Sequence, residues 1–262
     1  MLPMQEHGQA VRSRALAMIR EGASYSQVSD QLRVPRGTLG WWRHEERKAL
    51  RISVEPVHDC PRCEPRVFDH AAYSYLLGLY LGDGHITSRP KQHHLSIFCC
   101  DSWPGLIQAA EDAMRAVMAR PRVRRRQSTG CTEVKSFTRH WTCLFPQHGP
   151  GKKYQRAIVL EPWQQAIVRA HPWPFIRGLI HSDGCRVVNW TTKVVGGERK
   201  RYEYPRYFFS NKSDDIRALF TDALRMVGVE WTVLARGADP FNVSIARRAS
   251  VALMDAHVGP KF

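Results

Sequence analysis

The chain carries Ser74-Tyr-Leu-Leu-Gly-Leu-Tyr-Leu-Gly-Asp83-Gly84, and it repeats the pattern later as Pro174-Phe-Ile-Arg-Gly-Leu-Ile-His-Ser-Asp183-Gly184. Both stretches are apolar with helical character, and small residues recur in them four positions apart, at Ser74, Gly78 and Gly82 and at Gly178 and Ser182. Four residues make about one helical turn, so these positions line one ridge of each predicted helix. Glycine inside a helix costs about 1 kcal/mol relative to alanine. A close approach of two helix backbones would offset that cost.

Each stretch ends in Asp-Gly, and the glycine is predicted to end the helix in the left-handed conformation. Asp83 and Asp183 lie at helix C-termini, where a carboxylate is disfavoured by about 0.3–1 kcal/mol. Parallel packing of the two helices would also bring the carboxylates close enough to repel each other. A divalent cation such as Mg²⁺, which prefers oxygen ligands, would relieve both penalties. The alternative is a pair of buried Asp-Gly turns capped by backbone amides.

At these residues the sequence resembles the LAGLIDADG (DOD-type) homing endonucleases in their single-chain, two-motif form, over about residues 66–260. The resemblance implies an α+β fold of two pseudo-symmetric halves, with the motif helices at their interface and the antiparallel sheets forming a saddle for DNA. It also implies a shared active site in which the motif acids bind two or more Mg²⁺ ions. The implied metal-binding positions are Asp83, Asp183, Gly82 and Ser182.

The resemblance implies site-specific hydrolysis of double-stranded DNA. This reaction needs an activated water, charge relief on the phosphate and stabilisation of the leaving 3′ oxygen, and metal ions between carboxylates can supply all three. In the family a basic side chain from each half often assists. The candidates are Lys135, Lys152, Lys193 and Lys212. Gly151-Lys-Lys153 resembles a Gly-x-Lys element of the family, and the sequence leaves open whether either lysine reaches the site.

The same fold, joined to a helix-turn-helix, also occurs in bacterial transcription regulators that have lost the catalytic acids. A non-catalytic, sequence-specific DNA-binding regulator is therefore the alternative function. Retention of both aspartates favours the endonuclease. In either case the sheets would contact phosphates and base edges through polar side chains. The candidates are Arg124, Arg126, Lys135, Asn189, Thr192 and Arg206.

Charge and composition agree with a nucleic-acid partner. The net charge is +15 over 262 residues, which indicates a polyanionic ligand. Membrane binding is the competing explanation, but no apolar run approaches the ~20 residues of a membrane span. The N-terminal residues predict no signal peptide, and seven cysteines, an odd count, predict a reducing compartment. We expect a cytoplasmic, nucleoid-associated monomer that binds double-stranded DNA.

Residues 1–50 are predicted to form a small all-α domain. Ser24 followed by Gln27 is a capping box, and Pro35 can open a third helix. Leu39 and Trp42 are expected in its core. The pattern resembles bacterial helix-turn-helix domains, in which the helix after the turn enters the major groove. Here that helix is the third one. The alternative is a protein-contact module. The residues expected to contact DNA are Arg36, Thr38 and Arg43.

Residues 51–66 are predicted to be a linker, because three prolines disfavour regular structure. The linker contains Cys60-Pro-Arg-Cys63, a C-x₂-C spacing that suits half of a Zn²⁺ site. The alternative is a pair of reduced cysteines. The sequence does not select the other ligands among the nearby candidates, which are His58, His70, His93, His94, Cys99 and Cys100.

Residues 67–150 and 151–262 are predicted to be the two LAGLIDADG halves, each running helix, hairpin, helix, hairpin, helix. This repeat predicts pseudo-twofold symmetry. In the first half the expected elements after the motif helix are strands 85–88 and 94–100, helix 103–119 and a hairpin over 120–138. In the second half they are strands 186–194 and 202–211, helix 214–227, a hairpin over 229–246 and helix 247–258.

Overall fold

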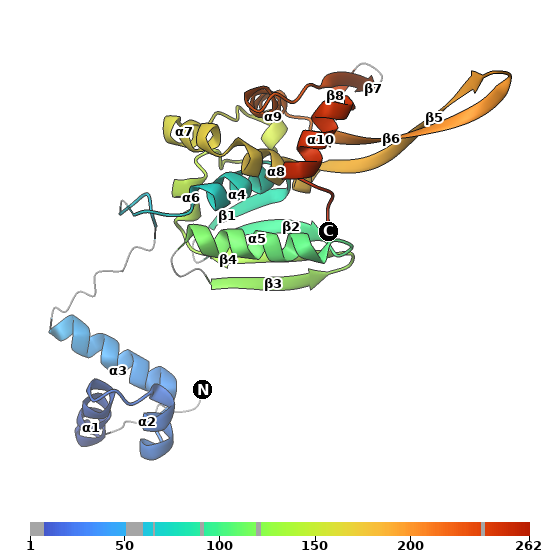
Figure 1. Cartoon of the computed structure of the whole chain (residues 1–262). Helices are drawn as coiled ribbons and strands as arrows, with labels where there is room; N and C mark the ends of the chain where they lie inside the picture. The colour runs from blue at the N-terminus through green and yellow to red at the C-terminus, as the bar shows by residue number, and fades with distance from the viewer. Residues whose placement is uncertain (1–7, 51–59, 65, 90–91, 119–121, 237–238) are drawn as a thin grey trace. The chain divides into compact units, whose positions relative to one another are not determined.

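A computed structural model describes residues 8–50, 60–64, 66–89, 92–118, 122–236 and 239–262. The chain divides into two compact units, Met1–Val57 and His58–Phe262. Figure 1 colours both along the chain. In the described parts no helix is both long enough and apolar enough to cross a membrane.

The described residues of the first unit, 8–50, form the helices α1 (Gln9–Arg20), α2 (Tyr25–Leu32) and α3 (Arg36–Ala49). The capping box is confirmed, since the Ser24 side chain accepts from the Gln27 amide and the Gln27 side chain accepts from the Ser24 amide. Pro35 is the N-cap of α3. Leu39 and Trp42 are buried, as predicted, in a core with Ala15, Leu16, Val28 and Val34.

The second unit is built from two halves with the same order of elements. The first half contains α4 (His70–Asp83), β1 (Gly84–Arg89), β2 (Gln92–Cys100), α5 (Pro104–Val117), β3 (Arg122–Ser128), β4 (Cys131–Phe137) and α6 (Trp141–Leu144). The connection contains the 3₁₀ turn η1 (Lys153–Gln155) and α7 (Pro162–Ala170). The second half contains α8 (Pro172–Asp183), β5 (Gly184–Val195), β6 (Glu198–Ser210), α9 (Asp214–Met226), β7 (Thr232–Arg236), β8 (Asp239–Ile245) and α10 (Arg248–His257).

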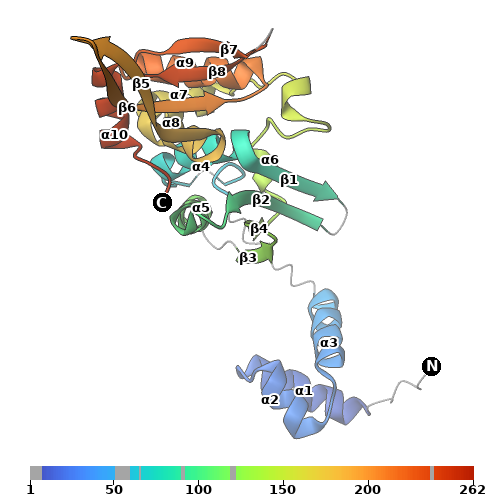
Figure 2. The ribbon, with the colours of Figure 1, turned by 90° about the vertical axis from the view of Figure 1, so that its right-hand side faces the viewer.

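The two sheets have equivalent topologies. Their strand orders are β1-β2-β4-β3 and β5-β6-β8-β7, with every neighbouring pair antiparallel. The predicted α+β fold of two pseudo-symmetric halves is therefore confirmed. Figures 1 and 2 show α4 and α8 between the two sheets.

The motif helices α4 and α8 pack with their backbones in contact. A Cβ on Gly78 would lie 2.6 Å from the Phe175 carbonyl oxygen, and a Cβ on Gly178 would lie 2.2 Å from the Tyr75 carbonyl oxygen. The side chain of Ser74 donates to the His171 carbonyl at 2.8 Å. The predicted ridge of small residues is thus the contact surface of the helix pair, where glycine leaves room for the opposing backbone.

The prediction for the glycines that end the motifs was wrong. Gly84 has φ −84° and Gly184 has φ −111°, both extended rather than left-handed. Each residue is the first of a strand and pairs across the sheet, Gly84 with Ile97 and Gly184 with Phe209. A Cβ on Gly84 would lie 2.4 Å from the Tyr80 Cα, and a Cβ on Gly184 would lie 2.7 Å from the Ile180 Cα. Close approach to the preceding helical turn therefore requires glycine here.

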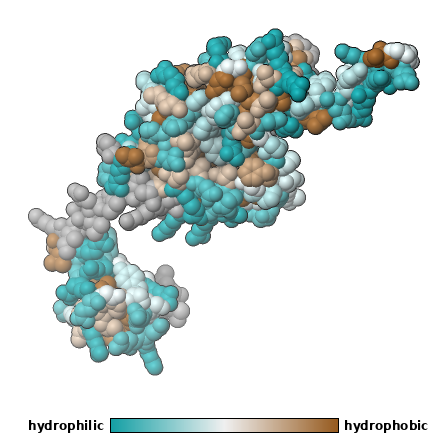
Figure 3. Space-filling model, in the orientation of Figure 1, coloured by the Kyte–Doolittle hydropathy of each residue, from teal (hydrophilic) through white to brown (hydrophobic). Residues whose placement is uncertain are grey.

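The hairpin of β5 and β6 is longer than the sequence predicted. The strands contain 12 and 13 residues, against 6 and 9 in the equivalent β1 and β2. Figure 1 shows the hairpin projecting beyond its sheet as an arm, and Figure 3 shows a mostly hydrophilic arm with hydrophobic atoms near the tip. Exposed apolar side chains on the arm are Val188, Trp190, Val194, Val195 and Tyr202.

Candidate functional site

Asp83 and Asp183 meet where the two motif helices end. The helices run in the same direction, because Gly78 lies against Gly178 and Gly82 lies against Ser182 one turn later. A Cβ on Gly82 would lie 3.1 Å from the Asp183 Oδ2. The parallel packing predicted from the repeat therefore brings the two carboxyl groups to one place.

The surroundings of the two carboxyl groups disfavour their ionised forms. Burial and the neighbouring Asp183 charge together raise the pKa of Asp83 to about 6, against the opposing effect of Lys261 and Lys153. Burial also raises the pKa of Asp183. Asn211 opposes that shift by donating to the Asp183 Oδ2 at 2.6 Å. Asp83 as a residue is exposed to solvent, so water screens part of the repulsion at its carboxylate.

Two lysines bind equivalent carbonyl groups at the motif ends. The Lys153 Nζ donates to the Gly82 carbonyl at 2.9 Å and to the Leu81 carbonyl at 3.1 Å. The Lys261 Nζ donates to the Ser182 carbonyl at 2.9 Å. Gly82 and Ser182 directly precede the two aspartates. Each helix C-terminus, with its partial negative charge and its carboxylate, is therefore matched by an ammonium group.

The Lys153 side chain lies at the motif ends, whereas the lysines considered as catalytic candidates from the sequence included its neighbour Lys152. Lys153 lies in η1 and its Nζ also donates to the Tyr80 carbonyl. Burial lowers the pKa of Lys153 to about 8, although both aspartates oppose the shift. The Gly-x-Lys pattern was the available signal, because its lysine position in Gly151-Lys-Lys153 is Lys153 and not Lys152. Lys261 carried no sequence signal, because it lies beyond the last predicted helix.

A pocket of ≈ 460 Å³ opens beside the aspartates, between the two halves of this unit. Asp183, Lys153 and Asn211 line one part of it, and His85, His148 and Arg156 line another. Lys152 and Lys212, two of the lysines considered as catalytic candidates from the sequence, also line it. Lys135 and Lys193 are not among the lining residues.

Lys135 and Lys193 instead occupy the sheets. Lys135 forms an ion pair with Glu133 at 3.1 Å on β4. Lys193 lies on the arm, directly opposite Lys200 on β6. Both residues therefore lie on strands outside the lining of this pocket.

The solvent-facing side of the first sheet carries a basic row. Strand pairing joins His85, Ser96, Lys135 and Arg124 across β1, β2, β4 and β3. The opposite side of the sheet is the core side, with Ile86, Leu95 and Val134 buried. Since side chains alternate along a strand, Arg126 shares the exposed side with Arg124. Both proposed arginines are thus on the outer face, and this face begins next to Asp83.

In the second sheet the proposed residues separate onto two sides. Asn189 pairs with Tyr204, and Val187 pairs with Arg206, which puts Asn189 and Arg206 on one side. Thr192 pairs with Arg201 on the other side of the arm. The Arg206 guanidinium lies over the Phe208 ring at 5.3 Å, and its Nε is buried without a hydrogen-bond partner among the described residues.

In the first unit the three proposed DNA contacts lie on α3. Arg36 is exposed and donates to the Ser26 Oγ at 2.6 Å. Thr38 is half-buried, and Arg43 forms an ion pair with Glu46. Arg36 is thus the member of this set that the fold presents most openly.

Cys60 and Cys63 have different neighbours from those the sequence suggested. They lie with His140 and Cys143, which are in or next to α6. His70, His93, His94, Cys99 and Cys100 are not in this group, and His58 lies outside the described residues. His140 and Cys143 follow about 80 residues later in the chain, so their proximity to Cys60 and Cys63 depends on the tertiary fold.

Neither a protein-family model nor a curated protein sequence matches the chain. Solved structures do resemble its fold. I-DmoI in complex with DNA and Mn aligns at a TM-score of 0.49 and 14% identity, covering 72% of this chain and 97% of that one. I-WcaI, a homing endonuclease bound to its DNA recognition sequence, aligns at 0.47 and 12%, covering 77% and 86%.

The N-terminal LAGLIDADG domain of WhiA aligns at a TM-score of 0.43 and 12% identity, covering 74% of this chain and 86% of that one. Identities of this size do not transfer an activity from one chain to another. The function has to follow from the side chains described above.

The donor groups at the motif ends fit Mg²⁺. They are the carboxylates of Asp83 and Asp183 and the carbonyl oxygens of Gly82 and Ser182, all hard oxygen ligands. Desolvation raises the pKa of both aspartates, and the Asp183 charge raises that of Asp83 further, against the opposing effect of Lys153 and Lys261. A divalent cation would supply the missing charge.

Proposed function

We propose that the chain is a Mg²⁺-dependent endonuclease that cuts double-stranded DNA at its paired motif aspartates. The observation that carries the proposal is the meeting of Asp83 and Asp183 at the ends of two parallel helices, beside a pocket lined by basic groups. A structural role alone does not require two carboxylates to repel each other at this position.

Asp83 and Asp183 would hold the metal, together with the carbonyl groups of Gly82 and Ser182. Bound Mg²⁺ supplies a water of lowered pKa and charge relief on the phosphate. Other residues of the chain would then position the metal-binding carboxylates and the phosphate. Asn211 orients the Asp183 carboxylate through its hydrogen bond, and His85 and Arg156 lie in the pocket where a phosphate would enter.

Lys153 is proposed as the proton-handling residue of the site. With a pKa of about 8, Lys153 is mostly protonated at neutral pH, and a substantial fraction becomes the neutral amine at slightly higher pH. A side chain with a pKa near the operating pH is suited to proton transfer. Lys153 can therefore accept a proton from water, or stabilise charge on a phosphate oxygen as an ammonium group.

We propose that DNA binds along the outer faces of the two sheets and the arm. These surfaces carry Arg124, Arg126 and Lys135 in the first half and Asn189 and Arg206 in the second, in a chain of net charge +15. Contacts to phosphates would position the duplex, and contacts to base edges would select it. Residues 1–50 would add a second contact through α3, most directly through Arg36.

The second candidate function is a DNA-binding regulator without activity, and one observation favours it. Lys153 and Lys261 already bind the carbonyl groups of Gly82 and Ser182. Two ammonium groups could therefore balance the two aspartates permanently, in the place of metal ions. In that case the aspartates and lysines would be a structural set.

Cleavage of a pooled library of duplexes, from the host genome and from randomised sites, distinguishes the two functions. The protein is incubated with Mg²⁺ or with EDTA, and ends are sequenced. The endonuclease predicts discrete Mg²⁺-dependent breaks that the Asp83→Asn/Asp183→Asn double variant does not produce. Asp112→Asn, an exposed change on α5, is the matched control and should cut normally.

Selective retention of particular duplexes without breaks would contradict the endonuclease and support the regulator. Equal cutting by the double variant and the wild type would remove the aspartates from the mechanism. Deletion of residues 1–50 should weaken binding and leave Mg²⁺-dependent cutting detectable. An unchanged affinity after this deletion would instead make the first unit a protein-contact module.

A further inference from the structure

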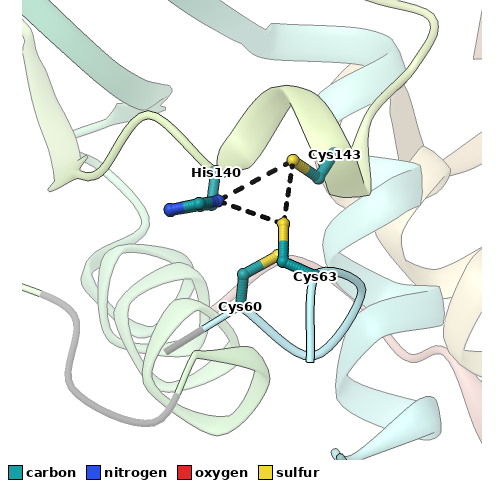
Figure 4. A group of neighbouring side chains, drawn as sticks. All are labelled: Cys60, Cys63, His140 and Cys143. Carbon is teal, nitrogen blue, oxygen red and sulfur yellow. Dashed lines mark hydrogen bonds between the residues drawn. The ribbon is translucent and has the colours of Figure 1, made fainter. Parts of the chain in front are cut away.

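A second group of metal-binding side chains lies apart from the aspartates. Cys60 and Cys63 come from the turn that opens the second unit, and His140 and Cys143 come from the segment at α6. Figure 4 shows the two sulfur atoms of Cys63 and Cys143 converging with the ring nitrogen of His140, with Cys60 beside them. One ligand atom from each of the four residues lies within 4.8 Å of the other three.

The distances match those between ligands of one tetrahedral Zn²⁺. A Zn–S bond of about 2.3 Å separates two sulfur ligands by about 3.8 Å and separates a sulfur from a nitrogen ligand by about 3.6 Å. The Sγ atoms of Cys63 and Cys143 are 3.7 Å apart. The His140 Nδ1 lies 3.3 Å from the Cys63 Sγ and 3.8 Å from the Cys143 Sγ.

We propose that Cys60, Cys63, His140 and Cys143 bind a structural Zn²⁺ ion. Three thiolates and an imidazole form a complete tetrahedral set with no position left for substrate, which is the character of structural rather than catalytic zinc. The spacing is two residues between the cysteines of the first pair and two between His140 and Cys143. Short loops of this kind are typical of structural zinc ligands.

A disulfide does not explain the group. The Cys63 and Cys143 sulfur atoms at 3.7 Å are far beyond the ~2.05 Å of an S–S bond. A disulfide would also leave Cys60, which has no exposed surface, and His140 without a reason to converge there. Soft sulfur ligands distinguish this site from the oxygen ligands at the motif ends, so the two sites select different metals.

The proposed ion would fasten the start of the second unit to the motif helix. α6 is already fixed to its surroundings, because the Trp141 Nε1 donates to the Ser136 carbonyl at 3.0 Å and the Leu144 carbonyl accepts from the Tyr73 hydroxyl at 2.6 Å. Tyr73 belongs to α4. The turn over residues 60–63 touches this framework through Arg62, whose guanidinium lies 4.5 Å from the centre of the Trp163 ring. The ion would tie Cys60 and Cys63 to that framework.

Metal analysis of the full chain tests the proposal. The protein is purified under reducing conditions without chelator, loaded with Zn²⁺, dialysed, and measured by mass spectrometry for metals. We expect about one Zn²⁺ per chain, and a loss of most of it in Cys143→Ser. Cys185→Ser, which removes an exposed cysteine outside the group, is the matched control and should keep the metal. Wild-type protein without zinc, or Cys143→Ser with as much zinc as wild type, would overturn the proposal.

A measurement on the unaltered chain covers the case in which Cys143→Ser does not fold. Co²⁺ added to reduced, metal-free protein should give the intense visible bands of tetrahedral coordination and a sulfur-to-cobalt charge-transfer band, and Zn²⁺ should abolish both. Weak bands of octahedral Co²⁺ that Mg²⁺ removes would place the metal at oxygen ligands and contradict the site. Neither readout depends on DNA cleavage, so failure of the proposed function leaves this test intact.

Discussion

Gly78 and Gly178 face each other across the pair of motif helices. A Cβ on Gly78 would lie 2.9 Å from the Gly178 Cα, and a Cβ on Gly178 would lie 3.0 Å from the Gly78 Cα. No side chain fits between the two backbones at this point. The spacing of the helices therefore depends on glycine at both positions. That spacing in turn sets the separation of the aspartates about one turn later.

Replacing Gly178 with alanine should destabilise the second unit. The new Cβ would lie 2.2 Å from the Tyr75 carbonyl oxygen, so the helices must move apart. Overpacking of this kind costs about 1–3 kcal/mol, and the melting temperature should fall by about 2–4 °C for each kcal/mol. Thermal unfolding followed by circular dichroism measures the change. Gly149→Ala, whose Cβ would meet Arg156 only at 3.6 Å, is the control; equal melting temperatures for both variants would contradict the packing argument.

Replacing Asp83 with asparagine should stabilise the metal-free protein at neutral pH. The pKa of Asp83 is raised from 3.8 to about 6 in the folded state. Between these values the folded protein binds more protons than the unfolded chain, so stability falls as the pH rises, and the penalty is complete above about pH 6. Solvent at the edge of Asp83 reduces the effect, and we expect a gain of about 1 kcal/mol near pH 7.5 and none near pH 4.

Urea unfolding in EDTA at both pH values measures this gain. Asp255→Asn is a control of opposite sign, because Arg186 and Tyr207 bind this carboxylate and lower its pKa. Its stabilising contribution is present above its unfolded pKa and disappears in acid, so the variant should lose stability at neutral pH. If Asp83→Asn is less stable than wild type at neutral pH, the Asp83 charge is stabilised by its neighbours in the folded protein, and the prediction is wrong.

Replacing Lys153 with methionine should slow DNA cleavage by at least about 10²-fold, the usual contribution of proton transfer by a side chain. Affinity for DNA should change little, because the half-buried Lys153 donates to the carbonyls of Gly82 and Leu81 and does not lie on the sheet surface. Single-turnover rates across about pH 6–9 measure the effect, and the wild-type profile should bend near pH 8.

Lys152→Met is the matched control for this experiment. Lys152 lies at the same pocket, with its Nζ 5.7 Å from the centre of the Tyr154 ring. Its removal should leave the pH profile in place. A large loss of rate in Lys152→Met with a normal Lys153→Met would return the catalytic role to the residue first proposed from the sequence.

Replacing Lys193 with glutamine should reduce non-specific affinity for DNA and its salt dependence. Lys193 and Lys200 are directly opposite on the arm, and like charges in this arrangement destabilise a strand pair unless an anion lies between them. Loss of one phosphate contact should lower the slope of log K against log salt by about 0.9. Fluorescence anisotropy with a random-sequence duplex measures the slope, and Arg225→Gln, on α9 in an ion pair with Asp222, is the control. Identical slopes for wild type and Lys193→Gln would show that Lys193 on the arm does not contact a DNA phosphate.

The repeated motif was sufficient to predict the central architecture. Small residues four apart determine which faces of α4 and α8 meet, and an aspartate at the same place in each motif then has to meet its counterpart. Local spacing and close packing were therefore sufficient to predict the contact of α4 with α8. The order of elements in both halves was predicted from the repeated strand and helix patterns and from the family resemblance, and it is confirmed.

Other features depended on contacts that local sequence does not encode. Gly84 was interpreted as a helix stop, but strand pairing with Ile97 extends the backbone directly from the helix. Lys152 and Lys153 are adjacent lysines, and the hydrogen bonds from Lys153 to the carbonyl groups of α4 depend on the turn of η1 in the folded chain. His140 and Cys143 lie far from Cys60 and Cys63 in the chain, so the four proposed zinc ligands come together only in the folded structure.

The first hairpins of the two halves differ in length, so the two halves extend over different distances. β5 and β6 contain 12 and 13 residues, whereas β1 and β2 contain 6 and 9. A palindromic duplex presents two identical half-sites, and a symmetric protein matches it. On the proposed function, this chain would match a different target: a non-palindromic sequence, contacted over more base pairs on the side of β5 and β6. A footprint centred on the cut would then be lopsided, and its longer flank would identify which half of the protein lies there.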